Sequence, residues 1–213
     1  DQKQAIATAA EHRVMLLTGG PGTGKTTTVN GILALFDRMD MKTELAAPTG
    51  RAAKRLGELC GREASTIHRL LETQFDPEDG KLCFMHDESE PLKADAVIVD
   101  ETSMVDILLM EALLRALKPE CRLILVGDPD QLPSVGAGNL FSDLIRSKRI
   151  PTVRLTEIFR QARESLIVMN AHSINQGDIP ELGRKDKDFF LLVRRDNQSI
   201  VETITDLCAR RLP

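Results

Sequence analysis

The sequence has 213 residues, which fits one large domain or one domain with a small insertion. Hydrophobic residues make up 42% of it and charged residues 28%, an ordinary composition for a soluble protein, and no apolar run approaches the ~20 residues of a membrane span. The formal net charge of −4 argues against a generally basic nucleic-acid binder, although a local basic stripe is enough to bind phosphates.

The cysteines and the aromatic residues narrow the class further. The four cysteines have neither metal-ligand nor disulfide-framework spacing, and no charged-then-apolar leader follows Asp1. We therefore expect a cytoplasmic protein with reduced thiols and no membrane partner. Tryptophan and tyrosine are absent, so stacking on bases would depend on the seven Phe and four His residues or on arginine planes. This favours tracking a nucleic-acid backbone over reading bases.

Short apolar runs alternate along the chain with longer segments of helical period, which is typical of βαβ units and a parallel sheet. In chain order, we expect strands at residues 14–18, 43–47, 96–100, 122–127, 152–155 and 189–193. We expect helices at residues 26–40, 52–59, 104–117 and 165–175. Such connections place helices on both faces of the sheet and active loops at the carboxyl ends of the strands. The pattern therefore predicts an α/β fold around a mostly parallel sheet.

A polar, acidic stretch at residues 72–93 interrupts this alternation. It contains the turn pair Asp79-Gly80 between two short strand-like runs. We interpret it as a β-hairpin inserted between two strands of the sheet, in which Phe75 and Phe84 could stack across the strands. A long surface loop explains the same residues about equally well.

Residues 19–26 match the phosphate-binding pattern G-x-x-x-x-G-K-[ST], directly after an apolar strand and at the start of a helix. Its glycines let backbone N–H groups approach phosphate, and the helix N-terminus adds the positive end of its dipole. Lys25 is expected to neutralise the β- and γ-phosphates, and Thr26 to hold Mg²⁺. Chance alone would produce the pattern in roughly one such chain in a hundred. The expected nucleotide-binding residues here are Gly20, Pro21, Gly22, Thr23, Gly24, Lys25, Thr26 and Thr27.

Two acids, Asp100 and Glu101, end the next apolar run at a suitable distance downstream for a second nucleotide motif. A strand in this position would deliver Asp100 to Mg²⁺, directly or through water, and place Glu101 to polarise the attacking water. Paired acids at a strand end are by themselves more often a solvated terminus or a helix N-cap. The phosphate-binding loop upstream favours the nucleotide role.

A third apolar run leads into a polar loop at residues 127–133. Gln131 in this loop could report the γ-phosphate through a hydrogen bond, without a change of charge. A simple strand and turn, punctuated by Pro129 and Pro133, fits the same residues equally well.

Taken in order, these motifs resemble those of superfamily 1 DNA helicases, and within them the RecD-like branch. Gln2 is similar to the glutamine with which this family recognises adenine. Residues 47–53 (Ala-Pro-Thr-Gly-Arg-Ala-Ala) and residues 65–71 (Ser-Thr-Ile-His-Arg-Leu-Leu) are similar to two elements that contact single-stranded DNA. Thr102 is a mild departure, because the family commonly has alanine after the two acids.

Later runs extend the resemblance over nearly the whole chain. Residues 127–136 are close to the family's third motif and residues 155–161 to its fourth, and residues 170–175 also look RecD-like. The resemblance implies that Gln131 couples the γ-phosphate to DNA and that Arg160 acts as an arginine finger. An arginine after an aromatic residue is otherwise a common surface ion-pair partner.

The resemblance implies a RecA-like P-loop NTPase domain over residues 1–213, with the hairpin at residues 72–93 as a strand-separation pin. It implies an ATP-dependent DNA helicase that uses Mg²⁺, moves 5′ to 3′ on single-stranded DNA and unwinds duplexes at junctions. The DNA-contacting residues that it implies are Pro48, Thr49, Gly50, Arg51, Thr66 and His68. Thr49 and Arg51 also fit a helix N-cap and a solvated first turn, and His68 a packing histidine.

A different class of function is a nucleotide-gated DNA-binding switch that does not unwind. A GTPase switch is disfavoured, because the sequence contains no guanine-reading Asn-Lys-x-Asp element. After Asn175 only about forty residues follow, too few for a second motor domain, and the chain begins abruptly at the glutamine motif. We therefore expect a monomeric fragment of a longer parent, weak or inactive on its own without the parent's second motor domain.

Overall fold

The computed structural model describes the backbone of residues 1–76 and 81–210, and the side chains of these residues except 75, 76, 81, 82, 160 and 161. The chain divides into two compact units, Asp1–Phe159 and Arg160–Pro213, which are described separately below. Within the described residues, no helix is both long and apolar enough to cross a membrane.

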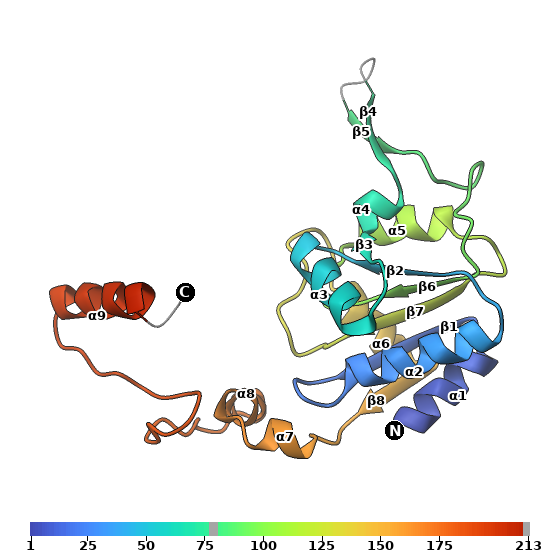
Figure 1. The fold of residues 1–213 in the computed structure, drawn as a ribbon. Coiled ribbons are helices and arrows are strands. Elements are labelled where there is room, and N and C mark those ends of the chain that lie inside the picture. The colour runs from blue at the N-terminus through green and yellow to red at the C-terminus, as the bar shows by residue number, and fades with distance from the viewer. Residues whose placement is uncertain (77–80, 211–213) are drawn as a thin grey trace. The chain divides into compact units, whose positions relative to one another are not determined.

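A parallel sheet forms the centre of the first unit, with strand order β3-β2-β6-β7-β1-β8 in the described part of the chain (Figure 1). The strands are β1 (Val14–Gly19), β2 (Thr43–Ala47), β3 (Ser65–Thr66), β6 (Ala96–Val99), β7 (Arg122–Gly127) and β8 (Thr152–Leu155). The α/β prediction is confirmed, and the predicted ranges of β1, β2, β6, β7 and β8 agree with the structure to within one residue.

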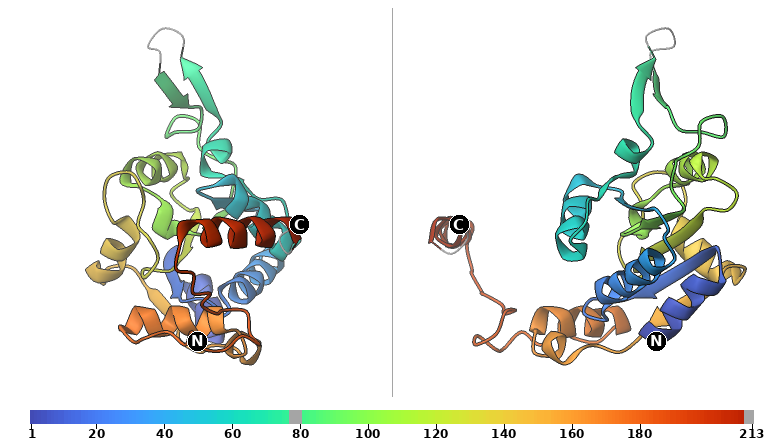
Figure 2. Two further views of the ribbon diagram at one scale, coloured as in Figure 1. Left: turned by 90° about the vertical axis from the view of Figure 1, so that its left-hand side faces the viewer. Right: turned by 45° about the vertical axis from the view of Figure 1, so that its right-hand side comes forward.

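Helices cover both faces of this sheet (Figures 1 and 2). On one face, the core contains residues of α1 (Gln2–Glu11), α2 (Lys25–Arg38) and α3 (Gly50–Cys60). On the other, it contains residues of α4 (Ile67–Leu70), α5 (Ile107–Ala116) and α6 (Leu140–Ser147). Successive strand residues alternate between the two cores, as Leu16 and Leu17 do, so a strand buried on both faces must be apolar throughout.

Several helices differ from the sequence prediction. The helices α1, α4 and α6 and the two-residue strand β3 were not predicted. The helix expected at residues 104–117 begins three residues later, at Ile107. A 3-10 turn, η1 (Thr102–Met104), precedes it, and the Asp106 carboxylate then caps α5 by accepting a hydrogen bond from the Leu109 N–H at 2.8 Å. The cap fixes the true start of this helix.

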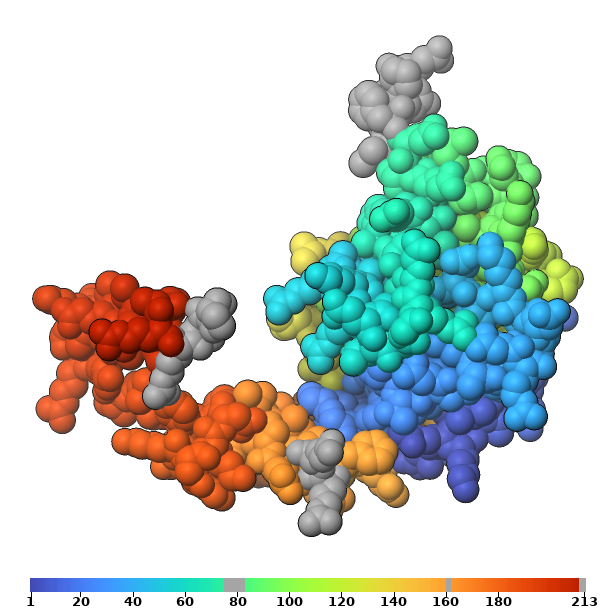
Figure 3. Space-filling view, in the orientation of Figure 1, coloured from blue at the N-terminus to red at the C-terminus, as the bar shows by residue number. Residues whose placement is uncertain are grey.

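The predicted hairpin is confirmed as an antiparallel pair, β4 (Thr73–Asp76) and β5 (Lys81–Phe84). In the space-filling view, its base stands out from the sheet unit beside α4 (Figure 3). The register sets Thr73 opposite Phe84 and Phe75 opposite Leu82, so Phe75 and Phe84 are not directly opposite each other. The Phe75 side chain lies outside the described residues, so its stacking on Phe84 stays a prediction. The predicted turn at Asp79-Gly80 lies outside the described residues.

The second unit is helical in its described part, with α7 (Arg160–Arg163), α8 (Leu166–Gln176) and α9 (Asn197–Arg210). The predicted helix at residues 165–175 is confirmed. Asn170 is buried, and its side-chain amide makes two hydrogen bonds with the backbone of Glu181. It donates to the carbonyl at 2.9 Å and accepts from the N–H at 2.8 Å. These two bonds hold the loop after α8 against the helix.

The strand expected at residues 189–193 is wrong, because the structure has irregular backbone there. No strand is present among the described residues of the second unit to pair with it. An isolated strand leaves its backbone N–H and carbonyl groups without partners, so an apolar run alone does not form one. Leu191 and Val193 are exposed instead.

Candidate nucleotide-binding and DNA-contacting site

The predicted phosphate-binding loop joins the end of β1 to the start of α2. Gly24 occupies the N-cap position of α2 with φ +84°, a left-handed conformation that favours glycine. A Cβ atom at Gly24 would also lie 2.3 Å from the Phe159 ring and 2.7 Å from Gln2 Nε2. Both the backbone and the neighbouring side chains therefore require glycine here.

The ammonium group of Lys25 lies over this loop. Its Nζ donates hydrogen bonds to the carbonyl oxygens of Gly19, at 2.5 Å, and Gly20, at 3.3 Å. The hydroxyl of the buried Thr23 also donates to the Gly20 carbonyl, at 2.8 Å, and fixes the loop's shape. The positive charge is thus held where a bound phosphate would meet the helix N-terminus.

Asp100 and Glu101 follow β6 at the same edge of the sheet. Burial raises the pKa of Asp100, while a hydrogen bond from the Glu101 N–H and the charge of Lys25 lower it. Burial likewise raises the pKa of Glu101, the negative charges of Asp100 and Asp128 raise it further, and Lys25 lowers it. The charge of Lys25 thus acts on both predicted acids.

The backbone at Glu101 is left-handed, with φ +52°, which is uncommon for a residue other than glycine. The hydroxyl of Thr102, which is fully buried, donates to the Val99 carbonyl at 3.0 Å and closes this turn. Among the described atoms, Glu101 Oε2 and Ser103 Oγ are buried without a hydrogen-bond partner. Buried polar atoms of this kind normally bind a partner or water, so the turn presents hydrogen-bonding groups for a ligand.

The loop after β7 carries Gln131, whose side chain is exposed. Asp128 at its start is buried, and its carboxylate accepts a hydrogen bond from the Asp130 N–H at 3.1 Å. The far end of the loop rests on α5, where the Ile107 N–H donates to the Ala137 carbonyl at 3.2 Å. Gln131 is therefore an exposed residue of a loop that is held by hydrogen bonds at its start and at its far end.

Gln2 and Phe159 meet at the phosphate-binding loop, although they are far apart in the sequence. The side-chain amide of Gln2 donates to the Gly24 carbonyl at 3.4 Å, and the Phe159 N–H donates to the Gly22 carbonyl at 3.1 Å. The Phe159 ring lies against Gly24 and remains 45% exposed. Neither Phe159 nor Asp128 was predicted from the sequence as a site residue. The signal that could have found Phe159 is an aromatic residue just after the end of a strand.

Arg160, the predicted arginine finger, is the first residue of the second unit. Its backbone begins α7, and its side chain lies outside the described residues. Its role stays a prediction.

The two predicted DNA-contacting runs begin at the carboxyl ends of the neighbouring strands β2 and β3. Thr49 caps α3 by accepting a hydrogen bond from the Ala52 N–H at 3.3 Å, and Thr66 caps α4 by accepting one from the Arg69 N–H at 3.1 Å. Both threonines thus have a structural role, which leaves a DNA role as a prediction. Arg51 and His68 are exposed beside them.

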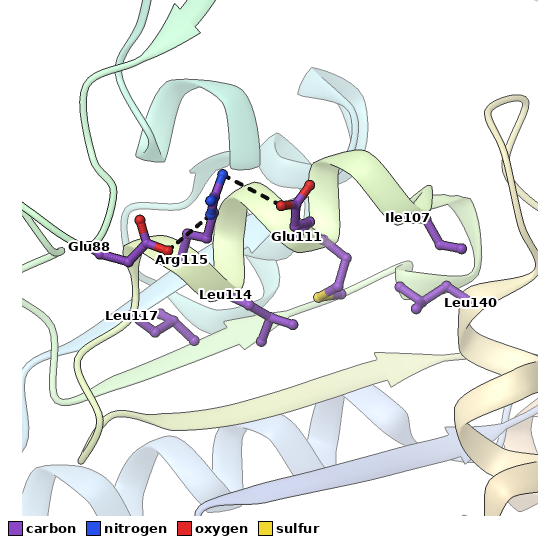
Figure 4. A pocket seen from close by; sticks show the side chains of 8 residues that line it. Glu88, Ile107, Glu111, Leu114, Arg115, Leu117 and Leu140 are labelled. Atoms are coloured by element: carbon purple, nitrogen blue, oxygen red, sulfur yellow. Dashed lines mark hydrogen bonds and ion pairs between the residues drawn. The ribbon is translucent and has the colours of Figure 1, made fainter.

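An apolar groove of about 440 Å³ runs along α5 (Figure 4). Arg115 spans one end of it, with ion pairs to Glu88 at 3.0 Å and to Glu111 at 3.5 Å. The groove is lined by Glu88, Ile107, Met110, Glu111, Leu114, Arg115, Leu117 and Leu140. None of the residues predicted to bind nucleotide or DNA lines it, so the groove is separate from the strand-edge site.

Comparison with known proteins decides the family. Residues 2–137 match the family model described as an AAA domain. The chain belongs to this family. Its relatives include the ATP-dependent RecD2 DNA helicase of Deinococcus radiodurans, 44% identical over 185 residues, which are 87% of this chain and 25% of the relative. They also include the RecBCD enzyme subunit RecD of Mycolicibacterium smegmatis, 38% identical over 204 residues, with 84% of this chain and 36% of the relative covered.

The fold has a solved counterpart in the Pif1 helicase from Candida albicans, with a TM-score of 0.58 at 24% identity, over 84% of this chain and 44% of that one. Together these relationships identify a RecA-like motor domain of the RecD-like, superfamily 1 type, as the motifs predicted. The chain spans only about a quarter to a third of the length of these two curated relatives.

Proposed function

We propose that this chain is the ATP-binding and ATP-hydrolysing motor domain of a DNA helicase. Its parent would translocate on single-stranded DNA from 5′ to 3′ and unwind duplex DNA. The observation that carries the proposal is the convergence of Lys25 with Asp100 and Glu101, since the charge of Lys25 acts on both half-buried carboxyl groups. A cation beside two acids at the carboxyl edge of a parallel sheet is suited to a metal-bound triphosphate.

The nucleotide would extend from the base pocket to the acids. Gln2 and Phe159 offer a hydrogen-bonding amide and an exposed ring side by side, which suits an adenine base. The backbone N–H groups of residues 20 and 22–27 would hold the phosphates together with Lys25. Thr26 and Asp100 offer the hydroxyl and carboxylate that Mg²⁺ takes when phosphates and water complete its shell. The metal would neutralise phosphate charge.

Glu101 is the proposed general base for hydrolysis. Its Oε2 atom lacks a partner in the described chain, and its pKa is raised by burial, two properties that favour a group accepting a proton from water. Gln131 would sense the γ-phosphate from its exposed loop, and Arg160 would act as an arginine finger. The attacking water would pass a proton to the Glu101 carboxylate as its oxygen bonds to the γ-phosphorus, and the bond from that phosphorus to the bridging oxygen of the β-phosphate would break to release ADP.

The DNA track would follow the ends of β2 and β3. The residues proposed to contact the strand are Pro48, Thr49, Gly50, Arg51, Thr66 and His68. A backbone N–H near a helix N-terminus and an exposed arginine both suit DNA phosphates. The hairpin at residues 72–93 would act as a pin, and the parent's second motor domain would close the ATP cleft. We place this monomeric motor in the cytoplasm.

The test uses the full-length parent protein. We expect a single-stranded oligonucleotide to stimulate its ATPase activity, and ATP to drive separation of a duplex with a 5′ single-stranded tail but not one with a 3′ tail. Stimulated ATPase without strand separation would instead support a nucleotide-gated DNA-binding switch. An ATPase that ignores DNA would contradict both functions.

A further inference from the structure

An aromatic contact joins the base of the hairpin to the predicted DNA-contacting run. The His68 ring, on α4, lies with its centroid 5.9 Å from the centroid of the Phe84 ring, on β5, with the ring planes tilted by 48°. This tilted arrangement is one that aromatic pairs favour. His68 is exposed and Phe84 is half-buried, so the pair runs from the surface to the core.

Phe84 is in turn fixed to the sheet. It packs against the core cluster that contains Ile67 and Leu71, at the two ends of α4. On the β5 side, the Met85 N–H donates to the carbonyl oxygens of Leu71, at 3.1 Å, and Glu72, at 3.2 Å. The exit of the hairpin is thus bonded to the same short helix that leads into it.

The entrance of the hairpin is bonded to that helix as well. The Thr73 hydroxyl donates to the His68 carbonyl at 2.8 Å, and the Glu72 N–H donates to the Arg69 carbonyl at 3.1 Å. Glu72 itself has φ +52°, which makes a sharp turn from α4 into β4. His68 therefore contacts the hairpin twice, through its ring and through its backbone.

The short helix α4 starts directly after β3 and is capped by Thr66. A DNA strand bound at Thr66 and His68 would therefore contact the same short helix that is hydrogen-bonded to the hairpin. Two elements attached to one rigid turn cannot move independently, so the position of one determines the position of the other.

We propose that His68 and Phe84 are positioning residues, whose ring contact sets the hairpin against the bound strand so that translocation is converted into strand separation. This inference rests on the proposed function. It assigns to the His68 ring a contact within the protein, in addition to the DNA contact proposed for this residue. The contact between the two rings would affect how many base pairs are separated for each ATP hydrolysed.

A double-mutant cycle in the full-length parent tests the contact, with His68→Ala, Phe84→Leu and the two together. The quantity measured is base pairs separated per ATP hydrolysed, at saturating single-stranded DNA. Each single change should lower this ratio roughly twofold to tenfold, the range expected for an aromatic pair. The double variant should lose no more than a single one. In Phe84→Leu, DNA-stimulated ATPase should stay at the wild-type rate, which also reports an intact fold.

An exchanged pair, His68→Phe with Phe84→His, should recover most of the lost ratio. Losses that multiply in the double variant, or a wild-type ratio in His68→Ala, would overturn the proposal. So would a lower maximal ATPase in a folded Phe84→Leu variant, because the loss would then lie in ATP hydrolysis rather than in its coupling to strand separation. If Phe84→Leu fails to fold, Phe84→Met takes its place in the cycle, since it removes the ring and keeps a large apolar side chain. Absence of unwinding by the wild-type parent would instead overturn the proposed function.

Discussion

The hydroxyl of Thr102 donates a hydrogen bond to the carbonyl of Val99 at 3.0 Å, and the two acids of the candidate ATP site lie within the turn that this bond closes. The hydrogen bond of the fully buried Thr102 side chain therefore stabilises the turn that contains the left-handed backbone of Glu101. The Thr102 hydroxyl thus adds a hydrogen bond to this turn and is itself satisfied.

Replacing Thr102 by valine should destabilise the chain, because valine keeps the shape of threonine but leaves the Val99 carbonyl without this donor. We expect the free energy of unfolding to fall by about 1 kcal/mol. Thr102→Ser keeps the hydroxyl and should lose much less. Urea unfolding of both variants measures the difference, and equal stabilities would mean that the hydroxyl contributes nothing.

Lys25→Ala in the full-length parent should abolish ATP hydrolysis and leave the fold intact. Lys25 is the first residue of α2, and its ammonium contacts only carbonyl oxygens among the interactions described, so its loss removes phosphate charge neutralisation without opening the core. Steady-state ATPase and circular dichroism together measure the outcome. Wild-type turnover in this variant would reject the phosphate-binding assignment.

Glu101→Gln should slow hydrolysis by ~10²–10⁴-fold and leave nucleotide affinity close to that of the wild type. Glutamine keeps the size of the side chain but cannot accept the proton of the attacking water. Single-turnover hydrolysis and equilibrium binding of ATP separate the two effects. Loss of binding with an unchanged rate constant would make Glu101 a metal ligand and leave Asp100 without its role.

Gly24→Ala should weaken ATP binding strongly. The left-handed backbone costs an alanine about 1–2 kcal/mol, and its Cβ would lie 2.3 Å from the Phe159 ring. Gly183→Ala is the matched control, because a Cβ atom there meets nothing within 4 Å and its backbone is not left-handed. Binding titrations with both variants of the parent should show a loss for Gly24→Ala alone; equal affinities would show that the loop tolerates a side chain.

Replacing residues 75–84 by a short glycine turn should uncouple unwinding from ATP hydrolysis. A pin acts by wedging the duplex apart, and the ATP site is built on other loops. DNA-stimulated ATPase should survive in the parent, and strand separation on a forked duplex should fail. Unwinding at the wild-type rate would show that the hairpin is not needed for strand separation.

Much of the fold was predictable because a parallel strand buried on both faces needs a continuous apolar run, as β1 and β7 have. The strand β3 has only two residues, Ser65 and Thr66, so no periodicity could reveal it. The prediction of a strand at residues 189–193 was wrong for the opposite reason. It has the composition of a strand, but strand formation depends on a neighbour, and local composition does not report neighbours.

The residues of the candidate site also differ in how far the sequence alone points to them. Lys25 and the two acids belong to contiguous motifs, whose order and spacing are visible in the sequence. Phe159 reaches Gly24 only through the folded sheet, across more than a hundred residues of chain, and Asp128 stands out only because its charge acts on Glu101. Local patterns therefore selected the residues proposed for the phosphates, the family resemblance added Gln2, and the contact of Phe159 with this loop emerged only from tertiary packing.

Phe159 is also the last residue of the first unit, one position before the chain enters the second. Its N–H is bonded to the phosphate-binding loop, and three residues earlier Thr156 is bonded through its N–H and hydroxyl to the Asp1 carboxylate, at 3.2 Å and 3.1 Å. The end of the first unit is therefore held by hydrogen bonds to the phosphate-binding loop and to Asp1, the residue before α1. A change in the backbone of this loop at Gly22 would act directly on the backbone of Phe159, the last residue of the unit.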